Sequence, residues 1–145
     1  MSFQFSLAAV LRIRGVLEEK EERLLQQILF EIGQAREEYA RIEAAILDLD
    51  AARSADVFKA HIGRNIHASY GEILELKQNR KNLEEKIDKL EQLRDRQIVV
   101  YEAAKRNREL LTGMHEEQRS VYDSGLARQE QKTIDDNYIA RRGRV

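Results

Sequence analysis

A row of positions spaced alternately three and four residues apart, occupied mainly by apolar residues, runs along the second half of the chain, and no other feature constrains the fold as strongly. The alternation continues without a break from Ile66 to Tyr122. Helices that turn one apolar side toward a partner helix carry this heptad spacing. It predicts a long helix over about residues 66–139, whose partner-facing row, here called the seam, comprises Ile66, Ser69, Ile73, Leu76, Arg80, Leu83, Ile87, Leu90, Arg94, Gln97, Tyr101, Ala104, Arg108, Leu111, His115, Gln118 and Tyr122.

The first half of the chain has a seam of its own and predicts a helix over about residues 6–52. Its spacing is regular from Ile28 onward, whereas two consecutive steps of four, from Leu24 to Ile32, predict a stutter in the heptads. The chain contains no proline, so nothing in it forces a helix to kink. The predicted seam residues here are Leu7, Val10, Leu17, Leu24, Ile28, Ile32, Ala35, Tyr39, Ile42, Ile46 and Leu49.

The residues between the two seams break the heptad period and predict the tip of a hairpin at about 53–65. Ser54 is a candidate turn residue, Gly63 a candidate helix stop and Asn65 a candidate cap for the second helix. We therefore expect an all-α protein with a single domain over residues 1–145, folded as an antiparallel coiled-coil hairpin. Burial of apolar seam residues outweighs the entropy of closing a short connection.

Folding at this tip fixes a register between the two seams. It places Ile46 opposite Ile73, Ile42 opposite Leu76, Ala35 opposite Leu83, Ile28 opposite Leu90, Leu24 opposite Arg94 and Leu17 opposite Tyr101. In the same register Leu7 meets about Leu111, so the first helix is exhausted while the second continues. The stretch from Met114 to about Ile139 is expected to lack an intramolecular partner and to project about 35 Å.

Composition and motifs argue against an enzyme. Histidines 61, 67 and 115 lack ligand spacing, and the chain contains no cysteine, glycine-rich phosphate loop or zinc motif, so neither metal nor cofactor is expected. Charged residues make up 35% with a net charge of −1, and the two signs alternate, which disfavours nucleic acid as a partner. The apolar runs are too short to span a membrane, and the start lacks the features of a signal peptide, so a cytoplasmic location is expected.

Two blocks carry a resemblance to a known family. The N-terminus has the pattern Phe3-x-Phe5-x-Leu7, and the second half contains Tyr101-Glu102-Ala103-Ala104 followed by the basic run through Arg108. With its length and hairpin plan, the chain resembles the flagellar FliJ family of the type III export apparatus. Members of that family are similar to the central stalk of rotary ATPases, and their helix ends enter the ring of the hexameric export ATPase.

The resemblance implies a non-enzymatic protein that promotes ATPase assembly and activity. It implies contacts with the cytoplasmic domain of the export gate protein and with export chaperones, at the cytoplasmic side of the inner membrane at the flagellar base, without membrane insertion. The candidate ring contacts are Arg106, Arg108, Gln118, Tyr122, Glu130, Gln131 and Asp135; the candidate gate contacts are Phe58 and Tyr70.

Two alternatives remain open at this stage. The equivalent stalk protein of a virulence-type secretion system would carry the same heptads. A structural coiled-coil scaffold belongs to a different class of protein and would use its seam for self-association. Because this chain can satisfy its seam internally, we expect it to be a monomer when free.

Overall fold

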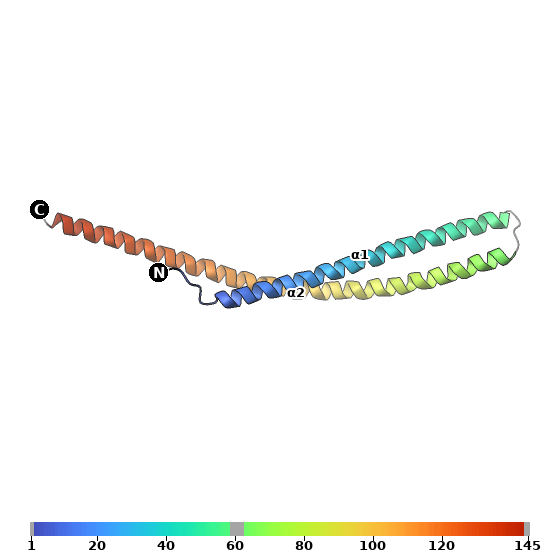
Figure 1. Ribbon diagram of the computed structural model, residues 1–145, viewed down its shortest axis with the longest axis horizontal. Coiled ribbons are helices and arrows are strands. Elements are labelled where there is room, and N and C mark those ends of the chain that lie inside the picture. The colour runs from blue at the N-terminus through green and yellow to red at the C-terminus, as the bar shows by residue number, and fades with distance from the viewer. Residues whose placement is uncertain (1, 59–62, 144–145) are drawn as a thin grey trace. The chain divides into compact units, whose positions relative to one another are not determined.

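The computed structural model describes the backbone of residues 2–58 and 63–143 and the side chains of residues 2–55 and 70–143. Two helices, α1 (Ala8–Phe58) and α2 (Gly63–Arg142), account for nearly all of these residues, and no strand occurs among them (Figure 1). The helices pack against each other as a helical hairpin, so the predicted fold class is confirmed.

The predicted tip at 53–65 was too wide. Ser54 lies inside α1, which continues to Phe58, and α2 begins at Gly63, so Gly63 opens a helix instead of ending one and Asn65 lies within the first turn. Residues 51–55 include three alanines, whose helix propensity is high, so α1 propagates past its last predicted seam residue. At its other end α2 reaches Arg142, where two arginines complement the negative end of the helix dipole.

The contacts divide the predicted single domain into two compact units, and each contains part of both helices. Unit 1 comprises Met1–Glu21 and Tyr101–Val145, and unit 2 comprises Glu22–Val100. Two ion pairs in unit 2 show that its helices are antiparallel. Arg36 of α1 contacts Glu91 of α2 at 2.7 Å, whereas the later α1 residue Glu43 contacts the earlier α2 residue Arg80 at 3.4 Å.

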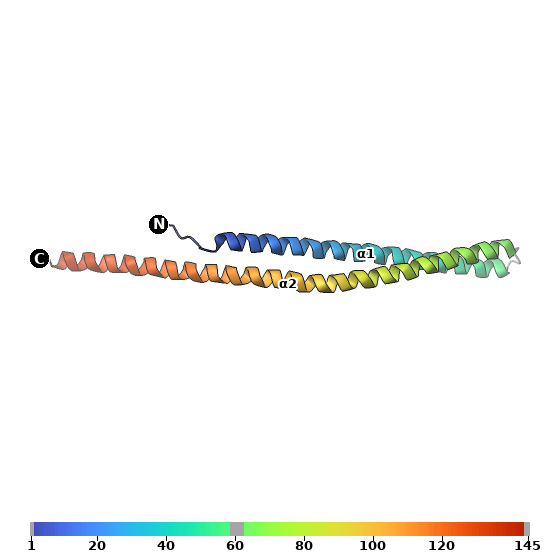
Figure 2. The same cartoon turned by 90° about the horizontal axis from the view of Figure 1, so that it is seen from below.

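The core of unit 2 consists of predicted seam residues, but the register differs from the predicted one. Arg36, predicted to face about residue 82, contacts Glu91, and Glu43, predicted to face about residue 75, contacts Arg80. Ala35 and Leu83, a predicted pair, are buried in one cluster with Ile32 and Leu90, and Ile28, the predicted partner of Leu90, packs against it. The other predicted seam residues Tyr39, Ile42 and Ile87 also pack on this cluster, while Ile46 and Ile73 are buried elsewhere and Leu76 is half-buried. Figure 2 shows α1 and α2 of this unit running alongside each other.

Most of the predicted α2 seam residues whose side chains the structure describes are buried or half-buried. Those from Ile73 to His115, Tyr101 included, are all buried or half-buried, as is Tyr122, and Gln118 alone among them is exposed. A side chain buried at every third or fourth position is what antiparallel helix pairing requires.

The predicted α1 seam was wrong in its first third. Leu17 and Leu24 are exposed by 39% and 41%, and Val10 is exposed as well. The half-buried residues are instead the ones that follow them, Leu11, Glu18 and Leu25. These continue the heptad spacing of Ile32 backward in steps of seven, so no stutter is needed. The predicted seam contained the apolar Leu17, whereas the half-buried position is the charged Glu18, whose charge Arg108 neutralises.

Candidate functional site

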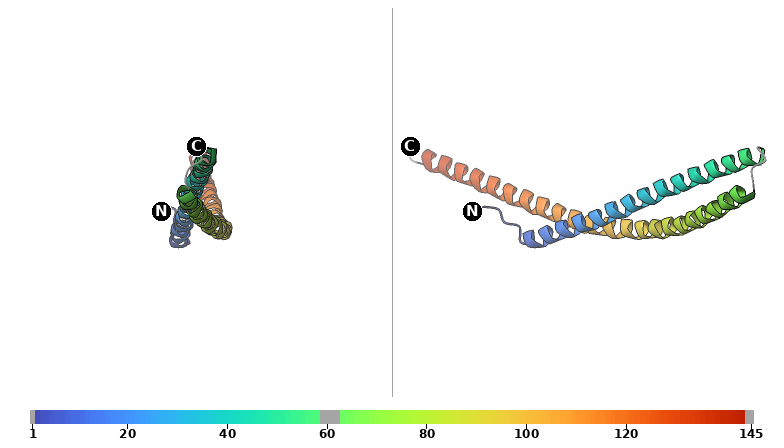
Figure 3. Two further views of the ribbon diagram at one scale, coloured as in Figure 1. Left: turned by 90° about the vertical axis from the view of Figure 1, so that its right-hand side faces the viewer. Right: turned by 45° about the vertical axis from the view of Figure 1, so that its right-hand side comes forward.

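The carboxyl-terminal part of α2 is a helix without a packing partner in the described chain. Every side chain from Asp123 to Arg142, here called the exposed α2 segment, is exposed, and Figure 3 shows the orange-to-red end of α2 with no other helix beside it. An isolated helix of this length is only marginally stable in water. Its exposed side chains include four large apolar ones, namely Leu126, Ile134, Tyr138 and Ile139.

Three predicted ring contacts lie on this segment. Glu130, Gln131 and Asp135 are all exposed, and the Gln131 amide Nε2 donates a hydrogen bond to Asp135 Oδ1 at 3.0 Å. Such a pair four residues apart supports an isolated helix. The structure therefore brings these three residues together on one helix with their side chains accessible.

An aromatic cluster closes the packed part of unit 1 just before this segment. Phe3 and Phe5, from the stretch ahead of α1, contact the His115 ring with centroids 5.5 and 4.9 Å apart, both edge to face. Phe3 also contacts the Tyr122 ring at 5.4 Å. Phe5 is buried. Within the stretch expected to lack a partner from Met114 onward, His115 and Tyr122 therefore have packing partners.

Sequence reasoning missed this cluster, although a signal for it was present. Phe3 and Phe5 are spaced two apart, so an extended chain turns both rings to the same side. A period of two differs from the heptad period of a helix, so a heptad pattern does not include these two residues.

The predicted ring contact Arg108 is engaged within unit 1. Its Nε donates to Glu18 Oε2 at 2.6 Å and its Nη2 donates to Glu18 Oε1 at 3.1 Å. The hydrogen bonds from Arg108 hold the pKa of Glu18 below its usual range, against the opposing effect of burial, and the positive charges of Arg108 and Lys105 lower it further. Arg108 thus joins α2 to α1, and its guanidinium already has a carboxylate partner.

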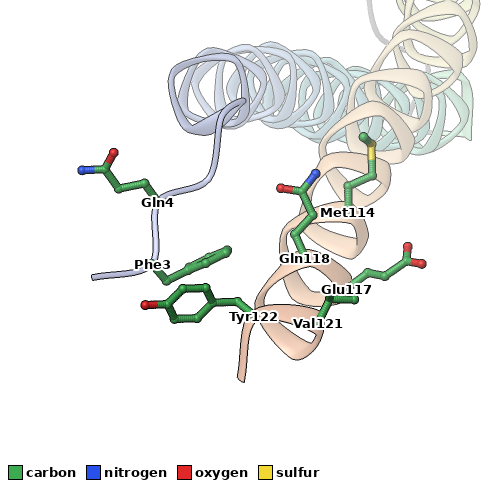
Figure 4. A pocket seen from close by; sticks show the side chains of 7 residues that line it. All are labelled: Phe3, Gln4, Met114, Glu117, Gln118, Val121 and Tyr122. Atoms are coloured by element: carbon green, nitrogen blue, oxygen red, sulfur yellow. The ribbon is translucent and has the colours of Figure 1, made fainter. Parts of the chain in front are cut away.

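The other predicted ring contacts surround this packed region. Arg106 is exposed, and its Nε donates to the Glu102 carbonyl oxygen at 3.4 Å. Gln118 is exposed, whereas Tyr122 is half-buried against Phe3. Gln118 and Tyr122 lie on the wall of an open groove of about 680 Å³, shown in Figure 4, which is lined by Phe3, Gln4, Met114, Glu117, Gln118, Val121 and Tyr122.

Of the two predicted gate contacts, the structure places one. Tyr70, in unit 2, is exposed, and the Arg53 guanidinium carbon lies 5.7 Å from the centre of its ring, within the range of a cation–π contact. The side chain of Phe58 lies outside the described residues, as do those of His61 and His67.

Over the described residues, no group of three or more His, Cys, Asp or Glu side chains is arranged to hold a metal ion. The helices, as far as they are described, include no stretch long and apolar enough to cross a membrane.

Comparison of the chain with protein-family models, with curated proteins and with solved structures finds no match.

Proposed function

We propose that this protein is a non-enzymatic, stalk-like component of the flagellar type III export apparatus. In this proposal it binds the ring of the export ATPase, promotes ring assembly and ATP hydrolysis, and contacts the cytoplasmic domain of the export gate and export chaperones. It acts as a monomer in the cytoplasm, at the inner membrane beside the flagellar base.

The exposed α2 segment is the observation that carries this proposal. A run of about 20 residues, about 30 Å long as a helix, remains helical with every side chain exposed. Its exposed apolar residues Leu126, Ile134, Tyr138 and Ile139 offer apolar surface to a partner. A helix end held away from its own fold has the form needed to enter a ring of subunits.

Glu130, Gln131 and Asp135 are the contacts we favour on this segment, because their side chains are accessible. Gln118 and Arg106 are accessible as well, nearer to the packed part of unit 1. Arg108 and Tyr122 have a different role in the proposal. They hold the N-terminal stretch and α1 against α2 and so set where the free segment begins.

The proposed gate contact is supported by fewer observations than the proposed ring contact. Tyr70 offers an exposed aromatic ring in unit 2, and Phe58 follows from the resemblance alone. We assign both to the gate as part of the same proposal.

The test measures ATP hydrolysis and ring assembly by the cognate flagellar export ATPase, with the full chain and with a version ending at Asp123. This end point removes the exposed segment but keeps the aromatic cluster and the Glu18–Arg108 pair. We expect the full chain to stimulate both activities and the shortened chain to stimulate neither. A shortened chain that stimulates as strongly as the full one would show that the exposed α2 segment is not the working part.

A virulence-type secretion stalk remains the nearest alternative, and the same assay with that system's ATPase distinguishes it. The scaffold alternative predicts self-association instead. Sedimentation at micromolar concentration separates it, because a scaffold would form dimers or larger species while a stalk would remain a monomer.

A further inference from the structure

Unit 1 carries a second row of apolar side chains beside its seam. On α2, the exposed residues Leu110, Met114 and Val121 each come directly before a seam residue. On α1, Val10 and Leu17 come directly before the half-buried Leu11 and Glu18, and Ile13 is exposed nearby. A packed pair of helices needs only the seam, so these six residues call for a separate explanation.

Helix geometry puts the two rows on the same side of the pair. Each residue advances about 100° around a helix, so the residue before each seam position lies to one side of the seam. In an antiparallel pair the corresponding sides of the two helices face the same way, so both rows lie on one side of the pair. We call this side the apolar flank; it consists of Val10, Ile13, Leu17, Leu110, Met114 and Val121.

The opposite side of the pair has the reverse character. The six α2 residues that directly follow the seam positions from Tyr101 to Gln118 are all polar, namely Glu102, Lys105, Glu109, Thr112, Glu116 and Arg119. A surface that served solubility alone would be polar on both sides. The contrast between the two sides indicates that the apolar flank is a surface for a binding partner.

The groove seen in Figure 4 forms one end of this flank. Met114 and Val121 line it together with the ring of Phe3, and Glu117 lies on α2 between them in sequence. The corresponding hollow over the polar side is lined by Glu116, Arg119, Ser120, Asp123, Ser124 and Ala127. The groove on the flank therefore offers an apolar anchor side chain a place to enter, whereas the hollow on the polar side is lined mainly by charged and hydroxyl side chains.

The width of the flank fits one helix. Its two rows come from two packed helices whose axes lie about 8–10 Å apart, so a single additional helix laid between them contacts both rows. Because Leu17 lies next to the Glu18–Arg108 pair, the flank extends along α2 from about Arg108 to Val121, about 20 Å or about 13 helical residues.

Two charges give the flank a direction. Glu117 lies at the end near Phe3, and Lys20 lies at the other end, beyond Glu18. The amino end of a helix attracts an anion and the carboxyl end attracts a cation. A bound helix is thus favoured with its amino end and basic side chains at Glu117, and with its carboxyl end and acidic side chains at Lys20.

We propose that the apolar flank binds one amphipathic helix of another protein, oriented parallel to α1, with basic residues at its amino end and acidic residues at its carboxyl end. The site is distinct from the exposed α2 segment, which begins only after Val121. It therefore does not depend on the proposed ring contact.

The test uses two synthetic peptides of about 13 residues, the length of the flank, with capped ends and the same leucine heptads. One has arginines in its first turn and glutamates in its last, and the other has these charges exchanged. Binding of each labelled peptide to the full chain is measured by fluorescence anisotropy at low salt. We expect the first peptide to bind at least about fivefold more tightly, since exchange replaces two favourable end contacts by unfavourable ones.

Two matched variants locate the site. Val121→Asn removes an apolar side chain of the flank, and Val16→Asn removes one that is similarly exposed, at 57% against 68%, but lies away from the flank. We expect Val121→Asn to weaken binding of the first peptide about tenfold and Val16→Asn to leave it unchanged. Glu117→Gln should reduce the difference between the two peptides.

Equal effects of the two valine variants, equal affinity of the two peptides, or no binding of either would overturn the proposal. Dimerisation of the chain that is lost in Val121→Asn would assign the flank to a second copy and would overturn it as well. None of these results bears on ATPase stimulation, so this inference and the proposed function can fail independently.

Discussion

Arg108 and Glu18, 90 residues apart in the chain, form a bidentate ion pair with donor–acceptor distances of 2.6 and 3.1 Å. Both side chains occupy positions where a coiled coil ordinarily places apolar residues, and Glu18 is only 14% exposed. The pair therefore fixes which residue of α1 faces Arg108, because a shift of either helix would leave a half-buried charge unpaired.

We expect removal of one partner to be more harmful than removal of both. Arg108→Leu leaves the Glu18 carboxylate half-buried without its partner, whereas the double variant Glu18→Leu with Arg108→Leu places two apolar residues in the seam. Urea unfolding should show Arg108→Leu to be less stable than the double variant.

The exposed pair Arg36 and Glu91 provides the control for this prediction. Its side chains are exposed by 59% and 33%, and its coupling in a double-mutant cycle should not exceed about 1 kcal/mol. A coupling between Glu18 and Arg108 no greater than that of the control would contradict a register-fixing role.

The same pair predicts a response to acid. Since the hydrogen bonds from Arg108 lower the pKa of Glu18 in the folded protein, its contribution to stability is fully present above the unfolded-state pKa of about 4.3. That contribution is lost as the pH falls through the lower, folded-state pKa. We expect the difference in urea midpoint between the native chain and Glu18→Gln to shrink below about pH 4. Parallel curves from pH 6 to 3 would show that the pair does not lower this pKa.

Two adjacent residues test the seam of unit 2. Ile73 is 2% exposed and Leu74 is 50% exposed, although both are large and apolar. Ile73→Ala leaves a cavity and should lower the free energy of unfolding by about 2–5 kcal/mol. Leu74→Ala should change it by less than about 1 kcal/mol, measured by the same urea titration. Similar losses at both positions would mean that the helix is rotated from the orientation described.

The heptad spacing was sufficient to predict two helices and their antiparallel pairing, because Ala35, Leu83 and Leu90 lie at regular intervals and are buried. It did not give the register, because Arg36 contacts Glu91 and not the residues near 82. The heptad spacing also failed where the buried side chain is charged and not apolar. Glu18 occupies a seam position through its hydrogen bonds with Arg108, and a pattern of hydrophobic residues does not register that compensation.

The candidate site could be predicted from the sequence only in part. The exposed α2 segment follows from counting residues on two helices of unequal length, and the exposure of Glu130 and Asp135 agrees with that count. The cluster around His115 did not follow, because it joins a non-helical stretch to α2 through ring geometry. The helix ends were also missed, since the alanines after Leu49 prolong α1 without a seam.

The last prediction concerns the N-terminal aromatic residues. Phe5 is buried against His115, whereas Phe3 is half-buried and contacts both His115 and Tyr122. Phe5→Ala should therefore cost unit 1 about 3 kcal/mol, within the range for removal of a buried phenylalanine, and Phe3→Ala should cost less. The loss should appear as faster amide hydrogen exchange in α2 around His115, with exchange around Leu83 in unit 2 unchanged.

Nuclear magnetic resonance gives an independent reading of this cluster. Since two rings lie edge to face with His115, its carbon-bound ring protons should have shifts that move toward those of a free histidine in Phe5→Ala. A Phe3→Leu variant retains apolar bulk and should preserve the Phe5 contribution. If the His115 shifts are the same in the native chain and in Phe5→Ala, the N-terminal stretch does not lie on α2, and the groove beside Val121 loses its Phe3 wall.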